Sequence, residues 1–134
     1  RKKLVGEISD VGYEVYYPEM SVPVYLRDAL MERSKMNLSL QKTEKHNTVS
    51  VTRICQSIIN KVPVLLEYSG PPNLYTELCI TAGVGEVTKK ATECITQIDL
   101  VEVAEKNYQR LKSELPMDLM MAEVLNATCG EFVI

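Results

Sequence analysis

The sequence contains no apolar run longer than a few residues. A membrane-spanning helix needs about 20 mostly apolar residues in succession, so we expect no transmembrane segment among these 134 residues. The chain begins with a short basic stretch, but no apolar segment follows it, and a secretory signal peptide is therefore not expected. Because an initiator methionine is also missing, we expect a piece of a longer protein.

Positive charge is scarce and scattered. The formal net charge is −3 at pH 7, and the only tight basic clusters are Arg1–Lys3 and Lys89–Lys90. Proteins that bind nucleic acid neutralise phosphates with grouped lysines and arginines. We therefore do not expect nucleic acid as a partner.

Motifs for catalysis and metal binding are missing too. The sequence has no G-x-S-x-G, no HExxH and no acidic metal cluster, and its four cysteines form no C-x-x-C pair. The single histidine, His46, lies in a polar turn, whereas the cysteines lie in apolar patterns. A cysteine nucleophile with a histidine base is therefore disfavoured. We expect no catalytic residue, no metal and no cofactor.

The cysteines indicate the compartment. Cys55, Cys79, Cys94 and Cys129 are expected to be free thiols, typical of an intracellular protein of the cytoplasm or nucleus. Their even number, together with the glycosylation sequons at Asn37 and Asn126, leaves a secreted, disulfide-bonded protein as the alternative.

The most apolar stretch of the chain runs from residue 49 to residue 68. Its first part has apolar residues at intervals of three and four, which predicts a helix with one buried face: Val51, Ile54, Cys55, Ile58, Ile59 and Val62. The unbroken run Val64–Leu66 follows and predicts a short strand that is buried on both faces. We place the start of the helix within three residues of Thr52.

Before this stretch, the pattern favours strands. Leu4–Ser9 and Gly12–Tyr17 are predicted to form a hairpin around a turn at Asp10–Gly12. A helix is expected from Ser21 to about Ser34. Alternation in residues 36–40 and 49–51 predicts a second hairpin.

After it, the pattern is helical. Helices are predicted over residues 73–82, 86–115 and 118–126, the long one being either kinked or divided at Asp99. Strands thus fall in the first half and helices in the second. We predict a single α+β domain spanning residues 1–134, with a small antiparallel sheet in the N-terminal half packed against a mostly helical C-terminal half.

Two groups of side chains are candidates for partner binding. Tyrosines are enriched at interfaces, and Tyr16 is expected to point outward, with Met20 on the loop that follows. The end of the chain is rich in methionine, which adapts to varied partners, and Met117, Met120 and Met121 leave little polar surface on a short helix.

A third candidate site is the glycine turn before the long helical region. Gly83 and Gly85 expose backbone N–H groups ahead of a helix, and Lys89 and Lys90 follow in its first turns, as in many anion-binding sites. However, the third glycine of the dinucleotide motif is missing, no strong strand is predicted before the turn, and Glu86 brings a carboxylate to the same place.

The sequence therefore favours a protein–protein interaction domain with a scaffold, adaptor or structural role. It would bind a protein partner or a second copy of itself and have no catalytic chemistry of its own. The alternative is a regulatory domain that binds a small ligand or anion at the Gly83–Lys90 turn. A viral structural protein would share the features of the first interpretation.

Overall fold

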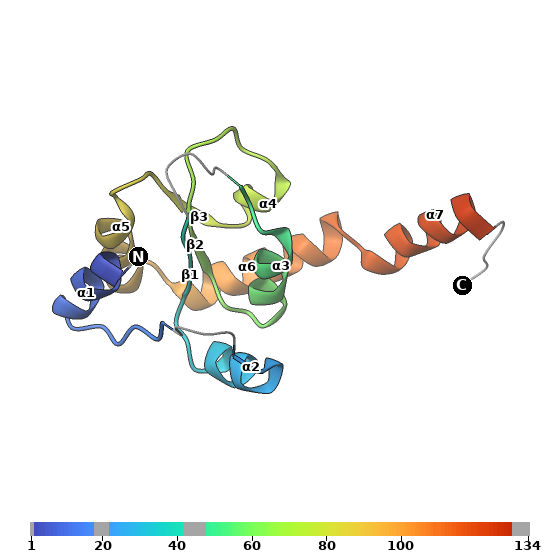
Figure 1. Cartoon of the computed structure of the whole chain (residues 1–134). Coiled ribbons are helices and arrows are strands. Elements are labelled where there is room, and N and C mark those ends of the chain that lie inside the picture. Colours follow the sequence, from blue (N-terminus) through green and yellow to red (C-terminus); the bar gives the residue numbers. More distant parts are fainter. Residues whose placement is uncertain (1, 18–21, 42–47, 130–134) are drawn as a thin grey trace.

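The computed structural model describes residues 2–17, 22–41 and 48–129. In chain order its elements are α1 (Lys2–Asp10), α2 (Val24–Glu32), β1 (Asn37–Ser39), α3 (Val51–Ile59), β2 (Val64–Glu67), α4 (Leu74–Glu77), β3 (Ile80–Ala82), α5 (Val87–Gln97), α6 (Leu100–Glu114) and α7 (Met117–Cys129) (Figure 1). None of the helices in the described ranges is long and apolar enough to cross a membrane.

The three strands form one sheet in the order β1-β2-β3, and both pairs are parallel. Leu65 in the central strand lies opposite Leu38 on one side and Ile80 on the other. The chain is α+β, but the predicted antiparallel sheet is wrong, and helices dominate the fold. β2 also shows why: parallel strands are typically covered on both faces, and three successive residues of β2 are buried.

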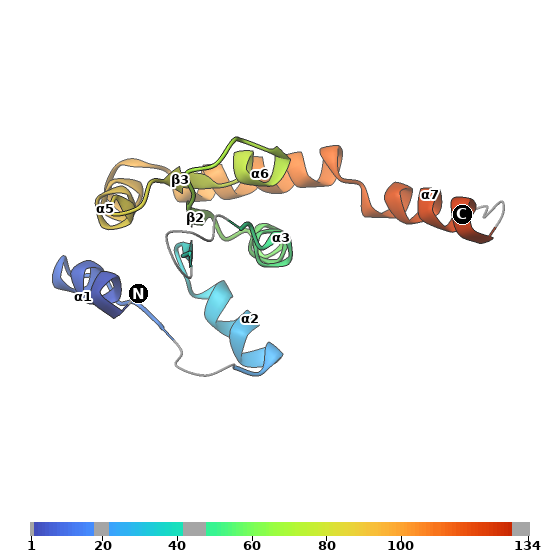
Figure 2. The same cartoon turned by 45° about the horizontal axis from the view of Figure 1, so that its top comes forward.

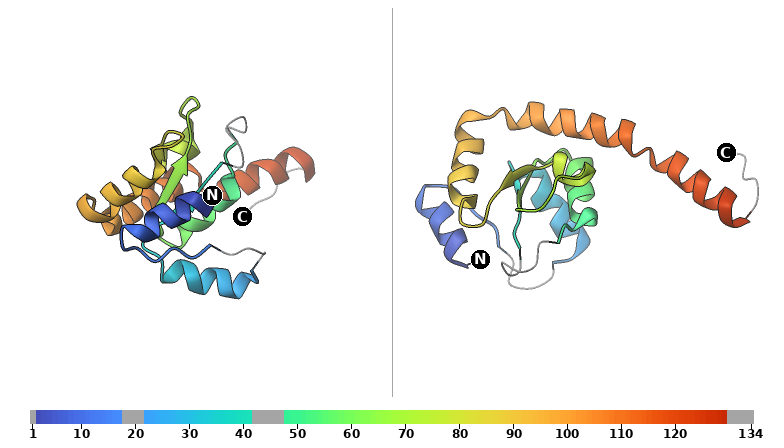
Figure 3. Two further views of the ribbon diagram at one scale, coloured as in Figure 1. Left: turned by 60° about the vertical axis from the view of Figure 1, so that its left-hand side comes forward. Right: turned by 90° about the horizontal axis from the view of Figure 1, so that it is seen from above.

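Helices cover both faces of the sheet, α3 and α6 on one and α1 and α5 on the other (Figures 2 and 3). Because successive side chains of a strand point to opposite faces, Val64 and Leu66 join the first core and Leu65 the second. The other buried residues of the first core are Ile54, Ile58, Leu78 and Leu111, and those of the second are Ile8, Ala82, Val87 and Ala91.

The predicted N-terminal hairpin is wrong. Residues 4–9 lie in α1, and residues 13–17 are in neither helix nor strand. The apolar residues Leu4 and Ile8 are four apart, so both pack on the second core from one side of a helix. The turn at Asp10–Gly12 exists but ends α1: Gly12 has φ 91° and its N–H donates to the Ser9 carbonyl oxygen at 2.9 Å.

The second predicted hairpin is also wrong. β1 pairs with β2 instead of residues 49–51, and Val51 begins α3, within the three residues allowed around Thr52. The helix predicted from Ser21 corresponds to α2, although Ser21 itself lies outside the described residues. Strand alternation had correctly located β1 but carried no information about its partner.

In the C-terminal half, the helix predicted over residues 73–82 is wrong in its second part. α4 ends at Glu77, and β3 begins at Ile80 as an edge strand. The division at Asp99 is confirmed, because the Asp99 carboxylate accepts the N–H groups of Val101 and Glu102 at 3.0 and 3.1 Å and caps α6. The predicted last helix lies within α7.

The buried face of α3 is rotated from the predicted one. Ile54 and Ile58 are 0% and 2% exposed, but Ile59 is 61% exposed, and Ser57 is buried in its place. The Ser57 hydroxyl accepts a hydrogen bond from the Asn37 amide at 2.6 Å and donates to the Arg53 carbonyl oxygen at 3.0 Å. A buried polar side chain is tolerated here because its hydrogen bonds are made.

Ile58 and its neighbour Ile59 therefore give a matched pair of substitutions. Ile58→Asp places an unpaired charge in the core and is expected to lower the free energy of unfolding by several kcal/mol, out of about 5–15 kcal/mol for a domain of this kind. Ile59→Asp is expected to change it by less than about 0.5 kcal/mol. Urea unfolding followed by circular dichroism checks both, and equal destabilisation by the two variants would contradict the placement of α3.

Candidate functional site

The last helix carries a large uncovered apolar surface. Met117, Leu119, Met120, Met121 and Val124 are between 40% and 66% exposed, and we call them the α7 surface. No residue of α7 is buried among residues 117–128, whose side chains the structure describes. Figures 1 and 2 show α7 leading away from the sheet and the helices that cover it. The predicted Met117, Met120 and Met121 are thus brought together on one exposed helix.

The position of α7 follows from the residues before it. α6 is held to the domain by the buried Ala104 and Leu111, and the last contact with the first core is made by Leu115. Pro116 comes next, and proline cannot donate the backbone hydrogen bond that would continue the helix. α7 begins immediately after it, with the Met120 N–H bonded to the Pro116 carbonyl oxygen at 3.0 Å. Leu115 is thus the last described residue of the chain that packs on either core.

Both the spacing and the charge of α7 are distinctive. Met117, Met120, Met121 and Val124 are three or four residues apart and share one side of the helix. Leu119 lies outside this stripe, so apolar side chains occupy more than one side. The charged residues of α7 are both acidic, Asp118 and Glu123, and Lys and Arg are absent from its sequence.

Further exposed apolar residues lie on α2 and in the segment before it. Tyr16, Tyr17, Val24, Tyr25 and Leu26 are each between 37% and 77% exposed. No residue of α2 is buried. The outward position of Tyr16 was predicted, although no strand holds it, whereas Met20 lies outside the described residues.

The exposure of α2 was missed by sequence reasoning. Tyr25, the most exposed tyrosine at 77%, belongs to the tyrosine-rich segment of residues 13–25, but it was not among the predicted site residues. Its place in that tyrosine-rich segment could have marked Tyr25 as a candidate partner-binding residue. Tyr13 and Val15 pack against the second core instead, which explains why the alternation there resembled a strand.

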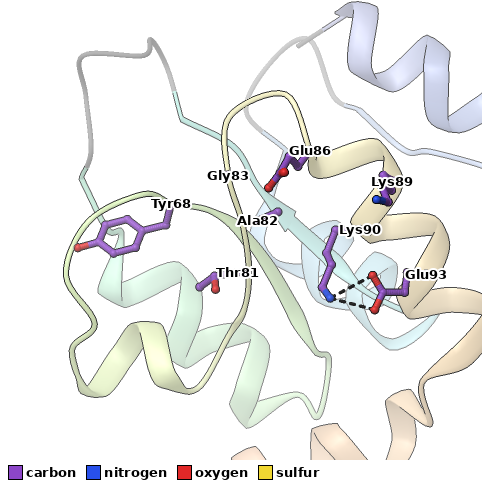
Figure 4. Close-up of a pocket in the computed structure, with 8 residues that line it drawn as sticks. All are labelled: Tyr68, Thr81, Ala82, Gly83, Glu86, Lys89, Lys90 and Glu93. Atoms are coloured by element: carbon purple, nitrogen blue, oxygen red, sulfur yellow. Dashed lines mark hydrogen bonds and ion pairs between the residues drawn. The ribbon is translucent and has the colours of Figure 1, made fainter.

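The glycine turn lies beside a pocket at the carboxyl ends of β2 and β3 (Figure 4). Its volume is about 270 Å³, and it is lined by Tyr68, Thr81, Ala82, Gly83, Glu86, Lys89, Lys90 and Glu93. β3 directly precedes the turn, so the expectation that no strand would do so is wrong. Gly85 does not line the pocket but has φ 82°, a backbone conformation that favours glycine.

The charges around the pocket are balanced. The Lys90 ammonium donates to both carboxylate oxygens of Glu93, at 3.0 and 3.1 Å, and this hydrogen bond raises the pKa of Lys90 above its usual value. Glu86 lies against Gly83: a Cβ atom on Gly83 would be 3.0 Å from its Oε2. Glu93 therefore competes with any anion for Lys90, and Glu86 adds a second carboxylate to the lining of the pocket.

The cysteines offer no activated nucleophile among the residues described. Cys55, Cys79 and Cys94 are free thiols, and burial raises the pKa of Cys79 to about 12, with Cys55 nearby adding to the shift. A thiol becomes a nucleophile as its thiolate, so this effect lowers its reactivity. His46, the expected base for a cysteine enzyme, lies outside the described residues.

The first glycosylation sequon and the possible metal ligands can also be placed in the fold. The side-chain amide of Asn37, in the first sequon, is bound to the buried Ser57 hydroxyl and is thus held within the fold. Within the described ranges, no three His, Cys, Asp or Glu side chains come close enough together to hold a metal ion.

Comparison with known proteins adds no assignment, since no family model, no curated protein and no solved structure matches this chain.

The raised pKa of Cys79 predicts that its thiol is alkylated slowly in the folded chain. At pH 8, iodoacetamide is expected to modify Cys79 at least tenfold more slowly in the folded chain than in urea, because the folded state holds almost no thiolate at this position. The unfolded chain ionises this thiol near its usual pKa of 9.0 and the folded chain only near 12, so the free energy of unfolding is expected to fall as the pH rises between these values. Mass spectrometry of alkylated peptides measures the first effect. Equal rates in both states would contradict the burial of Cys79.

Proposed function

We propose that this chain is a protein–protein assembly domain and that α7 is the element through which it assembles. The observation that carries this proposal is a 13-residue helix with apolar side chains on more than one side and no described residue buried. Helices of this composition are found buried in proteins, and large exposed apolar patches mark interaction sites.

The stability of α7 supports the same conclusion. An isolated helix shorter than about 12–15 residues is marginal in water, and α7 has 13 residues, with none of its described side chains buried. Docking against another surface would bury the apolar side chains that α7 leaves exposed. Methionine side chains suit such a contact because they adapt their shape to the facing surface.

The charge of α7 favours a protein over a lipid surface. Helices that lie on membranes usually carry lysine and arginine, which anionic headgroups attract. The only charged residues of α7 are Asp118 and Glu123, which anionic lipids repel. Its partner is therefore a protein: another chain or a second copy of this one.

Met120→Glu tests the proposal. A carboxylate in the middle of the α7 surface is expected to weaken association at least tenfold, equivalent to about 1.4 kcal/mol, while the melting temperature changes by no more than about 2 °C because α7 lies outside the core. Sedimentation velocity measures self-association, and titration against a protein purified on the immobilised chain measures partner binding.

Val101→Glu is the matched control for Met120→Glu. Val101 is 80% exposed on α6 and lies apart from the α7 surface, so the same chemical change is expected to leave association unaltered. If the Met120→Glu chain associates as strongly as the parent, α7 is not the assembly element.

A second candidate function is the binding of a small anionic ligand at the pocket. It is favoured by a strand, a glycine turn and a helix that succeed one another at the carboxyl edge of a parallel sheet, where α/β proteins often bind ligands. Lys89 and Lys90 line this pocket. The carboxylates of Glu86 and Glu93 count against it, which makes it the second candidate.

Inorganic phosphate tests the pocket. A bound ligand stabilises the folded state by mass action, so the parent is expected to melt at a higher temperature as phosphate rises through the millimolar range. The double variant Lys89→Ala/Lys90→Ala is expected to lose this increase. Lys106→Ala/Lys112→Ala on α6 removes the same charge elsewhere and is expected to keep it. No increase in the parent, at constant ionic strength, would rule out phosphate binding there.

A further inference from the structure

β3 forms one edge of the sheet, and its outer side carries backbone groups without partners. Ala82 is bonded toward β2, because its carbonyl oxygen accepts the Tyr68 N–H at 2.9 Å. Residues of a strand alternate in the side to which their backbone groups point, so the N–H and C=O of Thr81 point away from β2. Thr81 is exposed, and neither of these groups has a hydrogen-bond partner among the described residues.

The N–H of Gly83 points to the same outer side. In a trans peptide the C=O and N–H point in opposite directions, and the Ala82 carbonyl oxygen, in the same peptide unit, points to β2. The Gly83 N–H also has no partner in the part of the chain that the structure describes. The edge therefore presents a donor, an acceptor and a second donor in succession: Thr81 N–H, Thr81 C=O and Gly83 N–H.

One side of α5 lies beside this edge. Val87 and Ala91 hold α5 on the second core. The pocket is lined by Thr81 and Gly83 from the edge and by residues of α5 that are three or four apart and so share one side of the helix. These residues of α5 are Glu86, Lys89, Lys90 and Glu93. Figure 4 shows Thr81 between Tyr68 on one side and Lys90 with Glu93 on the other.

The charges on this side of α5 cancel. Lys90 is paired with Glu93, and Lys89 and Glu86 are of opposite sign. A small anion would meet two carboxylates here, and a carboxylate ligand offers acceptors only. An uncharged ligand that carries both donors and acceptors at regular spacing avoids this repulsion, and the main chain of an extended peptide is such a ligand.

We propose that the edge of β3 and this side of α5 bind an extended peptide segment of another protein, which adds to the sheet as a fourth strand. Its main chain accepts from the N–H groups of Thr81 and Gly83 and donates to the carbonyl oxygen of Thr81. Addition of a strand to an open sheet edge is a recurrent mode of peptide recognition, in which main-chain hydrogen bonds supply the affinity. This site does not involve α7, and its ligand differs from the small anion of the second candidate function.

Hydrogen exchange measured by NMR tests whether the edge is free. The N–H of Ala82 points to β2 and that of Thr81 points outward, so the Thr81 amide is expected to exchange at least tenfold faster than the Ala82 amide. Equal protection of the two amides would overturn the proposal. So would protection of Thr81 that increases with protein concentration, because a second copy of the chain would then occupy the edge.

A short capped peptide of alternating threonine and valine is the probe for binding. In the millimolar range it is expected to slow exchange of the Thr81 and Gly83 amides at least tenfold and to leave the Ala82 amide unchanged. Inorganic phosphate at the same concentration and ionic strength is expected to protect neither. No protection by the peptide, or equal protection by phosphate, would show that the edge is not a peptide site.

Thr81→Pro and Thr81→Val are a matched pair for the same measurement. Proline removes the outward N–H and is tolerated on edge strands where that N–H faces solvent, so Thr81→Pro is expected to weaken peptide binding at least tenfold. Thr81→Val keeps the N–H and a branched side chain and is expected to bind as the parent does. Equal binding by the two variants would contradict main-chain pairing at this edge. If Thr81→Pro does not fold by circular dichroism, protection of the Thr81 and Gly83 amides in the parent decides the question.

Met120→Glu separates this site from the proposed assembly through α7. Met120 lies on α7 and does not line the pocket. The Met120→Glu chain is therefore expected to bind the peptide with the affinity of the parent, whatever its effect on association. Loss of peptide binding in this variant would place the peptide on α7 and overturn its assignment to β3.

Discussion

Burial of the central strand on both faces is the constraint on which the rest of the structure depends. Val64, Leu65 and Leu66 are each no more than 1% exposed. A strand with apolar side chains on both faces needs a layer of helices on each side, and α3 with α6 and α1 with α5 supply these two layers. Burial of one apolar side chain contributes about 1.5–3 kcal/mol before entropy is subtracted, so no other three residues in succession contribute more to this fold.

Part of this organisation could be predicted from the sequence. Local signals were sufficient wherever one residue sets the structure: Asp99 capped a helix, Pro116 ended one, and the unbroken run of β2 formed a buried strand. The pairing of strands could not be predicted, because it depends on contacts between residues far apart in the chain. β3 was mistaken for helix, since a three-residue strand is too short to show an alternation.

The same distinction applies to the candidate site. Met117, Met120 and Met121 stood out in the sequence because the composition of this short helix is extreme, and all three are exposed, while their binding of a partner stays a prediction. The exposure of Tyr25 was not predicted, because the sequence placed a helix there without showing which of its side chains other elements would cover. In α3, spacing again failed to separate Ile58 from Ile59, although their exposed fractions are 2% and 61%. Periodicity thus identified helices, while burial depended on which neighbours reached them.

Small changes in backbone angle between α6 and α7 would move the far end of α7 by several ångströms. Leu115, with φ −130° and ψ 61°, departs from helical geometry and with Pro116 sets the direction in which α7 points. For an arm about 20 Å long, a rotation of about 10° at Leu115 moves the far end by about 3 Å. Because Leu115 also packs on the first core, a substitution there would change both the direction of α7 and one contact of that core. The orientation of the last helix and the packing of the first core therefore share one residue and cannot vary wholly independently.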